Sequence, residues 1–186
     1  IITEFIPDKK LFCELNSEEL NDTKKLINIF GIASAMAYLH SHNILHMNLD
    51  IFCIFLDQNL YPKLSLFDHS REIPNLSENQ VVKEQEVKGS IYIRSPEVIS
   101  KLEYSKASDV FAFAILIYRL FQSNRDLGQS ENILKGERPK FDLPIGDAYR
   151  KLIEKCWSHD PNSRPTFDQI VIELKTNTEF LTEKVD

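Results

Sequence analysis

Apolar and polar positions are most informative between residues 44 and 68, where two short apolar runs flank a polar turn. Short runs rich in Ile, Leu and Phe are typical of β-strands, so this stretch predicts strand, loop and strand. Apolar residues also recur at helical spacing over residues 26–40, and Asn21, Asp22 and Thr23 are candidate N-caps for that helix. A nearly all-apolar stretch, residues 104–121, predicts a second helix, and a helix this apolar must lie in the core.

The remaining segments are shorter or more polar. Residues 1–6 form an apolar run that predicts a strand, which Pro7 ends, and residues 11–15 have the length of one or two helical turns. Residues 71–88 are polar and predict an exposed loop, and residues 124–130 predict a turn-rich connector. The predicted fold is therefore mainly α with short β-hairpins, in the α+β class.

Composition narrows the class of protein. A chain of 186 residues with 42% hydrophobic content suits one domain with a substantial core. The net charge of −6, without a cluster of basic residues, gives no electrostatic footprint for nucleic acid or for an anionic membrane. No apolar run reaches the roughly 18 residues of a membrane span. Partners are expected to be proteins.

The cysteines and the N-terminus suggest a compartment. Cys13, Cys53 and Cys156 are odd in number, far apart and without metal-ligand spacing, which favours reduced thiols. The N-terminus lacks a basic region before an apolar stretch, so it does not resemble a secretory signal. The expected location is the cytoplasm.

Four segments carry a more specific signal. Residues 46–53 read H-M-N-L-D-I-F-C, residues 66–68 read L-F-D, residues 89–97 read G-S-I-Y-I-R-S-P-E, and residues 156–167 read C-W-S-H-D-P-N-S-R-P-T-F. They resemble H-R-D-L-x-x-x-N, D-F-G, G-T-x-x-Y-x-A-P-E and C-W-x-x-D-P-x-x-R-P-T-F of the eukaryotic protein kinases, in the tyrosine-kinase and tyrosine-kinase-like pattern.

The resemblance covers essentially the whole chain and implies a protein kinase-like fold. Residues 1–186 would be a partial kinase domain, consisting of the hinge and the C-terminal helical lobe only. The N-terminal lobe, with its Gly-rich loop and strand Lys, would precede Ile1 and is expected to be absent.

The positions that carry chemistry in this family are changed. In register with its motifs, Asn48 replaces the catalytic Asp, Cys53 replaces the metal-binding Asn, and Leu66 replaces the Asp of D-F-G. An amide cannot accept a proton near neutral pH, and Leu cannot bind a hard cation. No catalytic residue is therefore intact, and no metal site or cofactor is predicted. Met47 replaces the Arg that holds a phosphorylated activation segment in the family.

The resemblance also implies the remains of an adenine pocket. Thr3 would be the gatekeeper, Glu4, Phe5 and Ile6 would form the hinge, and Phe55 would lie under the adenine ring. Two simpler readings stay open, an ordinary edge strand for residues 1–6 and an ordinary core side chain for Phe55.

Structural roles carried over from the family fall on other positions. Glu97 and Arg164 would pair and tie the activation segment to the helical core. The full set of structural residues is His46, Phe67, Glu97, Asp109, Trp157 and Arg164.

Two acidic residues need separate interpretation. Asp50 stands where these kinases place a Lys or Ala, and a solvated surface carboxylate is expected there. A gapped alternative would read Asp68, His69 and Ser70 as a degenerate D-F-G and restore one metal ligand, but it requires a two-residue insertion in the β-turn.

Three functions are compatible with this sequence. The first is a catalytically inactive kinase-like domain that binds another protein, such as an active kinase or the N-terminal lobe, as a scaffold or regulator in signalling. The second is an active or weakly active Ser/Thr/Tyr protein kinase that binds ATP and Mg²⁺ through unusual ligands such as Asp50 and Asp68. The third is a truncated kinase fragment without function.

Overall fold

The computed structural model describes residues 9–86, 88–122 and 130–181. The helices are α1 (Leu11–Glu14), α2 (Asp22–Ser41), α3 (Pro96–Lys101), α4 (Lys106–Phe121), α5 (Ser130–Leu134), α6 (Asp147–Cys156) and α7 (Phe167–Thr176). Short 3-10 helices lie at Ile51–Cys53, Phe67–His69, Ile91–Ile93, Pro161–Ser163 and Thr178–Phe180.

The strands are short and pair two by two. They are β1 (Ile44–Leu45), β2 (Ile54–Leu56), β3 (Pro62–Leu64), β4 (Arg71–Glu72), β5 (Val82–Lys83) and β6 (Glu103–Tyr104). Each pair is antiparallel, β1 with β4, β2 with β3, and β5 with β6. The prediction of a mainly helical chain with short β pairs is confirmed, and the strand, loop and strand expected within residues 44–68 are present.

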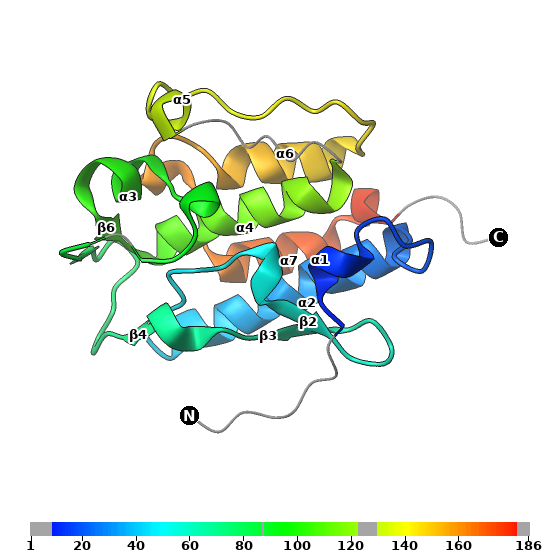
Figure 1. Cartoon of the computed structure of the whole chain (residues 1–186), viewed down its shortest axis with the longest axis horizontal. Helices are drawn as coiled ribbons and strands as arrows, with labels where there is room; N and C mark the ends of the chain where they lie inside the picture. The colour runs from blue at the N-terminus through cyan, green and yellow to red at the C-terminus, as the bar shows by residue number, and fades with distance from the viewer. Residues whose placement is uncertain (1–8, 87, 123–129, 182–186) are drawn as a thin grey trace.

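The two predicted helices begin at capped residues. The Asn21 side chain accepts from the Lys24 N–H at the start of α2, and Ser105 and Ser108 form a reciprocal capping box at the start of α4. Such caps satisfy backbone N–H groups that have no partner inside the helix. Figure 1 shows α4 running through the middle of the molecule, and nearly all of its residues are buried.

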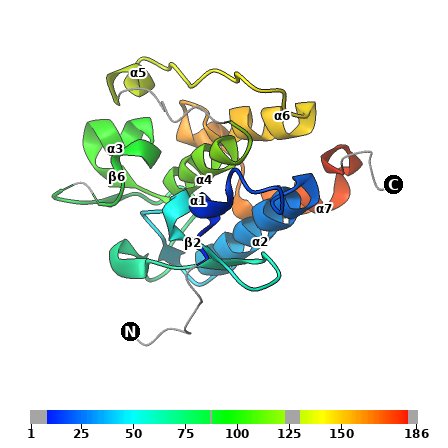
Figure 2. The same cartoon turned by 45° about the vertical axis from the view of Figure 1, so that its right-hand side comes forward.

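Other helices surround α4. It packs along α6, and α2 packs along α7. Figure 1 shows α6 on one side of α4 and α7 and α2 on the other, with α3 near one end, and Figure 2 shows the same helices from another side. The fully buried Phe111, Phe113 and Tyr118 supply much of the core from α4 alone. Each such side chain stabilises the fold by roughly 1.5–3 kcal/mol through the area it removes from water.

Residues 71–88 are mostly exposed, as their polarity predicted, but two of the described residues are buried. Leu76 is buried, and Glu84 is only 8% exposed. The short strands β4 and β5 pair with residues outside the segment. Polarity alone could not reveal these two residues, because Leu76 packs with Leu45, Val98 and Tyr104 and Glu84 pairs with Arg71 of the same segment.

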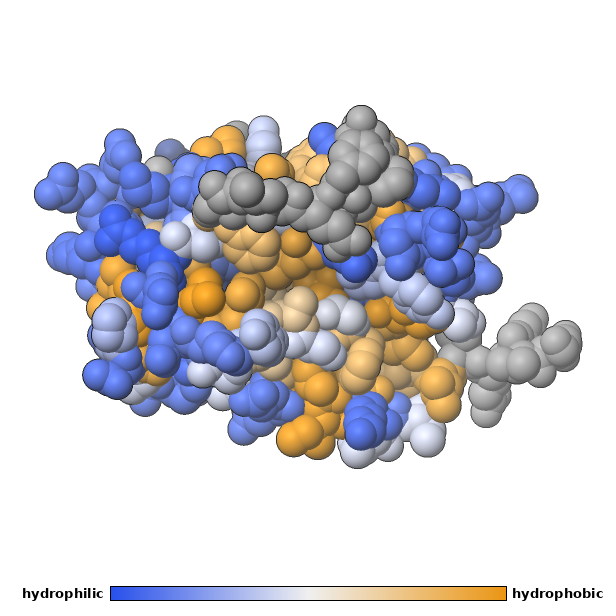
Figure 3. All heavy atoms as spheres, turned by 90° about the horizontal axis from the view of Figure 1, so that it is seen from below, coloured by the Kyte–Doolittle hydropathy of each residue, from blue (hydrophilic) through white to orange (hydrophobic). Residues whose placement is uncertain are grey.

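One face of the molecule, seen from below the view of Figure 1, has a hydrophobic area. Figure 3 shows hydrophobic atoms gathered over the middle of this face, with hydrophilic atoms toward its rim. Among exposed large hydrophobic side chains, Tyr61 and Leu66 lie at the ends of β3. In the part of the chain that the structure describes, no helix is both long and apolar enough to cross a membrane.

Candidate functional site

The loop between β1 and β2 is held by the carboxylate of Asp109, which is 2% exposed near the start of α4. Oxygen Oδ2 accepts from the His46 N–H at 2.9 Å, and Oδ1 accepts from the Met47 N–H at 2.9 Å. His40 Nε2 lies 3.0 Å from Oδ2. Met47 adopts a left-handed backbone with φ of 61°, which is uncommon for such a side chain. Asp109 therefore fixes the backbone at the turn that leads into the candidate site.

His46 is a buried structural residue in this loop. Its Nε2 lies 3.3 Å from the Ser65 carbonyl oxygen, and its ring lies 5.2 Å from the Phe67 ring. Burial lowers the pKa of His46 below its usual value. The neutral imidazole thus connects the loop to the turn that follows β3.

Asn48 uses its side-chain oxygen to hold a distant segment. Oδ1 accepts from the Ser90 N–H at 2.8 Å. Gly89 has φ of +70°, and a Cβ there would lie 2.5 Å from Asn48 Oδ1, so only glycine fits this close approach. The amide at position 48 has no basic site near neutral pH. Its role in this arrangement is structural.

Neither Cys53 nor Leu66 offers a ligand for Mg²⁺. The Cys53 thiol donates to the Asn48 carbonyl oxygen at 3.0 Å, and burial raises its pKa to about 11, so it stays protonated. Leu66 is 42% exposed and left-handed, with φ of 59°. Mg²⁺ requires oxygen ligands in octahedral geometry. Within the described residues there is no group of three or more His, Cys, Asp or Glu side chains that could hold a metal ion, so these residues do not fit the family's metals.

The expectation of a solvated Asp50 is wrong. Asp50 is 2% exposed, and its Oδ1 accepts from Arg119 Nη1 at 2.8 Å. Arg119 reaches it from the last turn of α4. A buried carboxylate needs a paired cation, and Arg119 supplies it. Asp50 is therefore a structural partner of α4 and not a free carboxylate in the candidate site.

Only part of the expected adenine pocket lies within the residues that the structure describes. Thr3, Glu4, Phe5 and Ile6 lie outside the described residues. Phe55 lies on β2 opposite Lys63, and the Lys10 ammonium is 5.5 Å from its ring centroid. Asp68 is exposed in the 3-10 helix after Leu66. The structure thus brings together His46, Asn48, Cys53 and Phe67 around one loop.

Comparison with known proteins decides the family. The family model described as protein tyrosine and serine/threonine kinase matches residues 1–174. The chain belongs to the protein kinase superfamily.

Individual relatives agree with that assignment. The chain is 29% identical over 183 residues to RGS domain-containing serine/threonine-protein kinase A of Dictyostelium discoideum, covering 94% of this chain and 16% of that protein. It is 34% identical over 149 residues to a probable serine/threonine-protein kinase of the same organism, covering 76% of this chain and 16% of that protein. It is 29% identical over 184 residues to the human cytoplasmic tyrosine-protein kinase BMX, covering 94% of this chain and 27% of that protein. The chain thus spans less than a third of the length of these relatives.

An ion pair joins two distant parts of this kinase-family chain. Arg164 Nη1 and Nη2 donate to Glu97 Oε1 and Oε2 at 2.7 and 2.9 Å, as the resemblance implied. The Arg164 side chain is 0% exposed, and it also donates to the carbonyl oxygens of Ala107 and Ser158. A bidentate pair with further hydrogen bonds is among the stronger polar contacts in proteins. It connects α3 to the start of α4 and to the residues before α7.

Trp157 lies in the aromatic part of the core. Its ring lies 5.7 Å from those of Tyr118 and Phe141, and the residue is 5% exposed. Arg138 Nε donates to its carbonyl oxygen at 2.9 Å. Trp157 therefore closes the end of α6 against α4.

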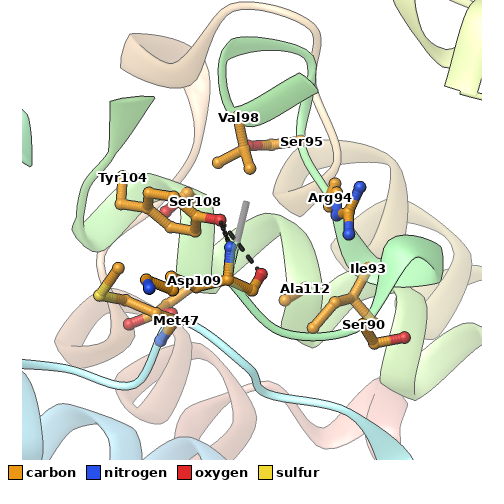
Figure 4. A pocket seen from close by; sticks show the side chains of 11 residues that line it. Met47, Ser90, Ile93, Arg94, Ser95, Val98, Tyr104, Ser108, Asp109 and Ala112 are labelled. Carbon is orange, nitrogen blue, oxygen red and sulfur yellow. Dashed lines mark hydrogen bonds between the residues drawn. The ribbon is translucent and has the colours of Figure 1, made fainter. Parts of the chain in front are cut away.

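Residues 71–104 are anchored to the kinase core without an Arg at position 47. Met47 is 4% exposed and belongs to an apolar cluster with Leu45, Leu76, Val98 and Tyr104. Figure 4 shows Met47, Tyr104 and Asp109 around a small cavity, and the Tyr104 hydroxyl contacts the backbone of Lys88. That cavity has a volume of about 20 Å³, enough for one water molecule.

Two charged pairs add to these contacts, one within the segment and one with α4. Arg71 Nη1 lies 2.9 Å from Glu84 Oε1, and Lys106 Nζ lies 2.6 Å from Glu78 Oε1. The Glu84 side chain is only 6% exposed. This pair joins Arg71 on β4 to Glu84 directly after β5, whereas the Lys106–Glu78 pair joins the segment to α4.

The sequence analysis did not identify the roles of three residues, Arg119, Glu84 and Gly89. Arg119 and Glu84 each pair across a long sequence separation, and no local pattern marks either as a partner. Gly89 was visible as the first residue of a family motif, but its close approach to Asn48 requires coordinates.

Removing the Arg164 side chain should destabilise the domain strongly. Arg164→Ala leaves Glu97 without its partner, and breaking a buried pair in this way costs roughly 3–5 kcal/mol. Chemical denaturation should show the loss as a lower midpoint. Lys155→Ala is the matched control, because Lys155 is 54% exposed and 3.8 Å from Glu173. A shift for Arg164→Ala no larger than the control's would contradict the account.

Removing the Glu84 carboxylate should loosen residues 71–84. Glu84→Ala abolishes the pair with Arg71, so amide hydrogen exchange at β5 should accelerate. Glu86→Ala is the control, since the Glu86 side chain is 75% exposed and pairs with the nearby Lys88.

Phosphorylation of Ser90 or Tyr92 should not order residues 71–84 through position 47, because Met47 offers no cation to a phosphate. Protection that rises on phosphorylation and disappears in Met47→Ala would be the opposite result.

Proposed function

We propose that this kinase-family chain transfers no phosphate and acts by binding another protein. The observation that carries the proposal is the bonding of the loop at residues 46–53. Phosphoryl transfer requires positioned Mg²⁺ ions and an oriented hydroxyl, with little covalent chemistry from the protein. In this chain the side chains at the relevant positions are an amide, a protonated thiol and an aliphatic group.

The way these side chains are engaged supports the proposal further. Asn48 Oδ1 and the Cys53 thiol take part in hydrogen bonds that hold the loop. Asp50, which could have served as an unusual ligand, is neutralised by Arg119. The loop thus has a defined backbone, and Asn48 Oδ1, the Cys53 thiol and Asp50 Oδ1 are each engaged in contacts within the fold.

We further propose that these residues form the helical, C-terminal lobe of a kinase-like domain. The central α4, the surrounding helices and the Glu97–Arg164 pair support this interpretation. Because the chain covers only part of each relative, the activity and partners of the whole protein belong to the same proposal. Location in the cytoplasm stays a prediction, and the three cysteines are free in the structure.

Binding of Mg·ATP is the direct test. Thermal unfolding of the protein should show no Mg²⁺-dependent rise in midpoint at millimolar ATP, because the triphosphate's charge would lack metal ions held by the protein. A radiolabel phosphotransfer assay should likewise show no incorporation into a general substrate. Leu66→Arg should behave as wild type in both measurements.

One result would contradict this proposal clearly. A Mg²⁺-dependent rise in the midpoint that Leu66→Arg abolishes would show that a metal-nucleotide site exists near this position. Phosphotransfer by the wild-type protein would establish the second function, an active kinase with unusual ligands.

A further inference from the structure

Asn48 joins three parts of the candidate site through its own polar groups. Its N–H donates to His46 Nδ1 at 3.3 Å, and its side-chain Oδ1 accepts from the Ser90 N–H at 2.8 Å. Its carbonyl oxygen accepts from the Cys53 thiol at 3.0 Å. A change at the contact with His46 therefore moves the residue that also holds Ser90.

The His46 ring makes its two contacts only when it is neutral and carries its hydrogen on Nε2. The Nε2 atom lies 3.3 Å from the Ser65 carbonyl oxygen, which can only accept, so Nε2 is the donor. The Nδ1 atom faces the Asn48 N–H, which can only donate, so Nδ1 presents its lone pair. Because His46 is 0% exposed, neither nitrogen can turn to solvent instead.

Three titratable neighbours act on this ring from the elements around it. Asp109 on α4 favours a protonated His46, whereas His40 on α2 and His69 in the 3-10 helix at Phe67–His69 disfavour it. Burial has the largest effect, and together these influences lower the pKa of His46 below its ordinary value of 6.5. The fold therefore favours the neutral ring that the contacts with Ser65 and Asn48 require.

A proton on His46 Nδ1 would place one N–H group against another. Asn48 would lose its acceptor and would have to move away from the ring. Its Oδ1 fits closely against residues 89 and 90, since a Cβ at Gly89 would lie only 2.5 Å from it. Ser90 in turn caps the 3-10 helix at Ile91–Ile93, where its Oγ accepts from the Tyr92 N–H. A displaced Asn48 would thus remove support from the start of that helix.

We propose that His46 is an acid-sensitive switch for residues 89–92, which are held by Asn48 while the ring is neutral and released when Nδ1 takes a proton. The released state accepts this proton more readily than the held state does. The held state is therefore fully favoured above the ordinary histidine value of 6.5 and weakens as the pH falls below it.

A proton on His40 does not replace this effect. Its Nε2 lies 3.0 Å from Asp109 Oδ2, and a protonated His40 would still donate there. The contact of Asp109 with the His46 N–H is likewise a backbone contact that the ring proton leaves in place. The proposed switch thus acts through Asn48, and it does not depend on the proposed lack of phosphotransfer.

Amide hydrogen exchange, followed by NMR on the full-length protein from about pH 7.5 to about pH 5.5, tests the switch. This range lies above the ordinary pKa values of Asp and Glu, which are about 4. Each rate is compared with the intrinsic rate at the same pH. Protection of the Asn48 and Ser90 amides should fall with acid, by up to about tenfold per pH unit, the limit for uptake of one proton. The Ile170 amide on α7, which donates to the Thr166 carbonyl oxygen, should stay protected.

Three variants separate the switch from other effects of acid. His46→Gln removes the titrating ring, so protection of the Ser90 amide should no longer depend on pH. His42→Gln is the matched control, because His42 is an exposed histidine that follows α2 and contacts the Tyr38 carbonyl oxygen; it should behave as wild type does. Asn48→Ala keeps the ring but lacks Oδ1, so the Ser90 amide should be equally weakly protected at every pH.

Folding of each variant is checked by circular dichroism and by the thermal midpoint at the upper pH. If His46→Gln does not fold, the wild type alone decides. The carbon-13 signals of the His46 ring should then change over the same pH range as the protection of the Ser90 amide.

Four results would overturn the inference. The first is protection of the Asn48 and Ser90 amides that acid leaves unchanged, and the second is the same loss of protection in His46→Gln as in wild type. The third is an equal loss at the Ile170 amide, because acid would then unfold the whole domain. The fourth is a His46 ring that titrates without any change in the protection of Ser90.

Discussion

The buried carboxylate of Asp109 is the contact on which the candidate site depends. Its two oxygens receive the backbone N–H groups of His46 and Met47, with His40 beside them. Both residues follow the end of β1, and Met47 is left-handed, so neither N–H group is paired in a strand. An unpaired buried N–H costs about 1–3 kcal/mol. The Asp109 side chain on α4 thus fixes the backbone position from which the rest of the loop at residues 46–53 continues.

From that start, the side chains of the loop at residues 46–53 bond to other parts of the fold. Asn48 supports the turn at Gly89 and Ser90, Cys53 bonds back to the Asn48 carbonyl, and Asp50 pairs with Arg119. Because Asp109 on α4 fixes the backbone of this loop, the loop tolerates different side chains at residues 48 and 53. Its shape does not depend on the side chains that perform catalysis in the family. Met47 likewise contributes by apolar packing, in the cluster with Leu45, Leu76, Val98 and Tyr104.

Sequence reasoning succeeded where the signal is local or carried by an extended motif. Helical spacing and N-cap candidates located α2, the nearly all-apolar run located α4, and the resemblance at Glu97 and Arg164 indicated that these two residues meet. It failed for Asp50, because the residue that decides its burial lies 69 positions later, on another element. It correctly predicted that residues 71–88 are mostly exposed, but it could not identify Leu76 and Glu84 as the buried residues of that segment. Thr3, Glu4, Phe5 and Ile6 lie outside the described residues, so the expected hinge stays a prediction.

The most direct measurement is the effect of Asp109→Asn on stability and amide exchange. An amide at this position presents one donor to the N–H groups of His46 and Met47, so at least one of them loses its acceptor. The account predicts a loss of about 2 kcal/mol or more in the free energy of unfolding, with faster exchange at both amides. Unchanged stability and unchanged protection of His46 and Met47 would show that the loop holds its shape without Asp109, and would contradict the account.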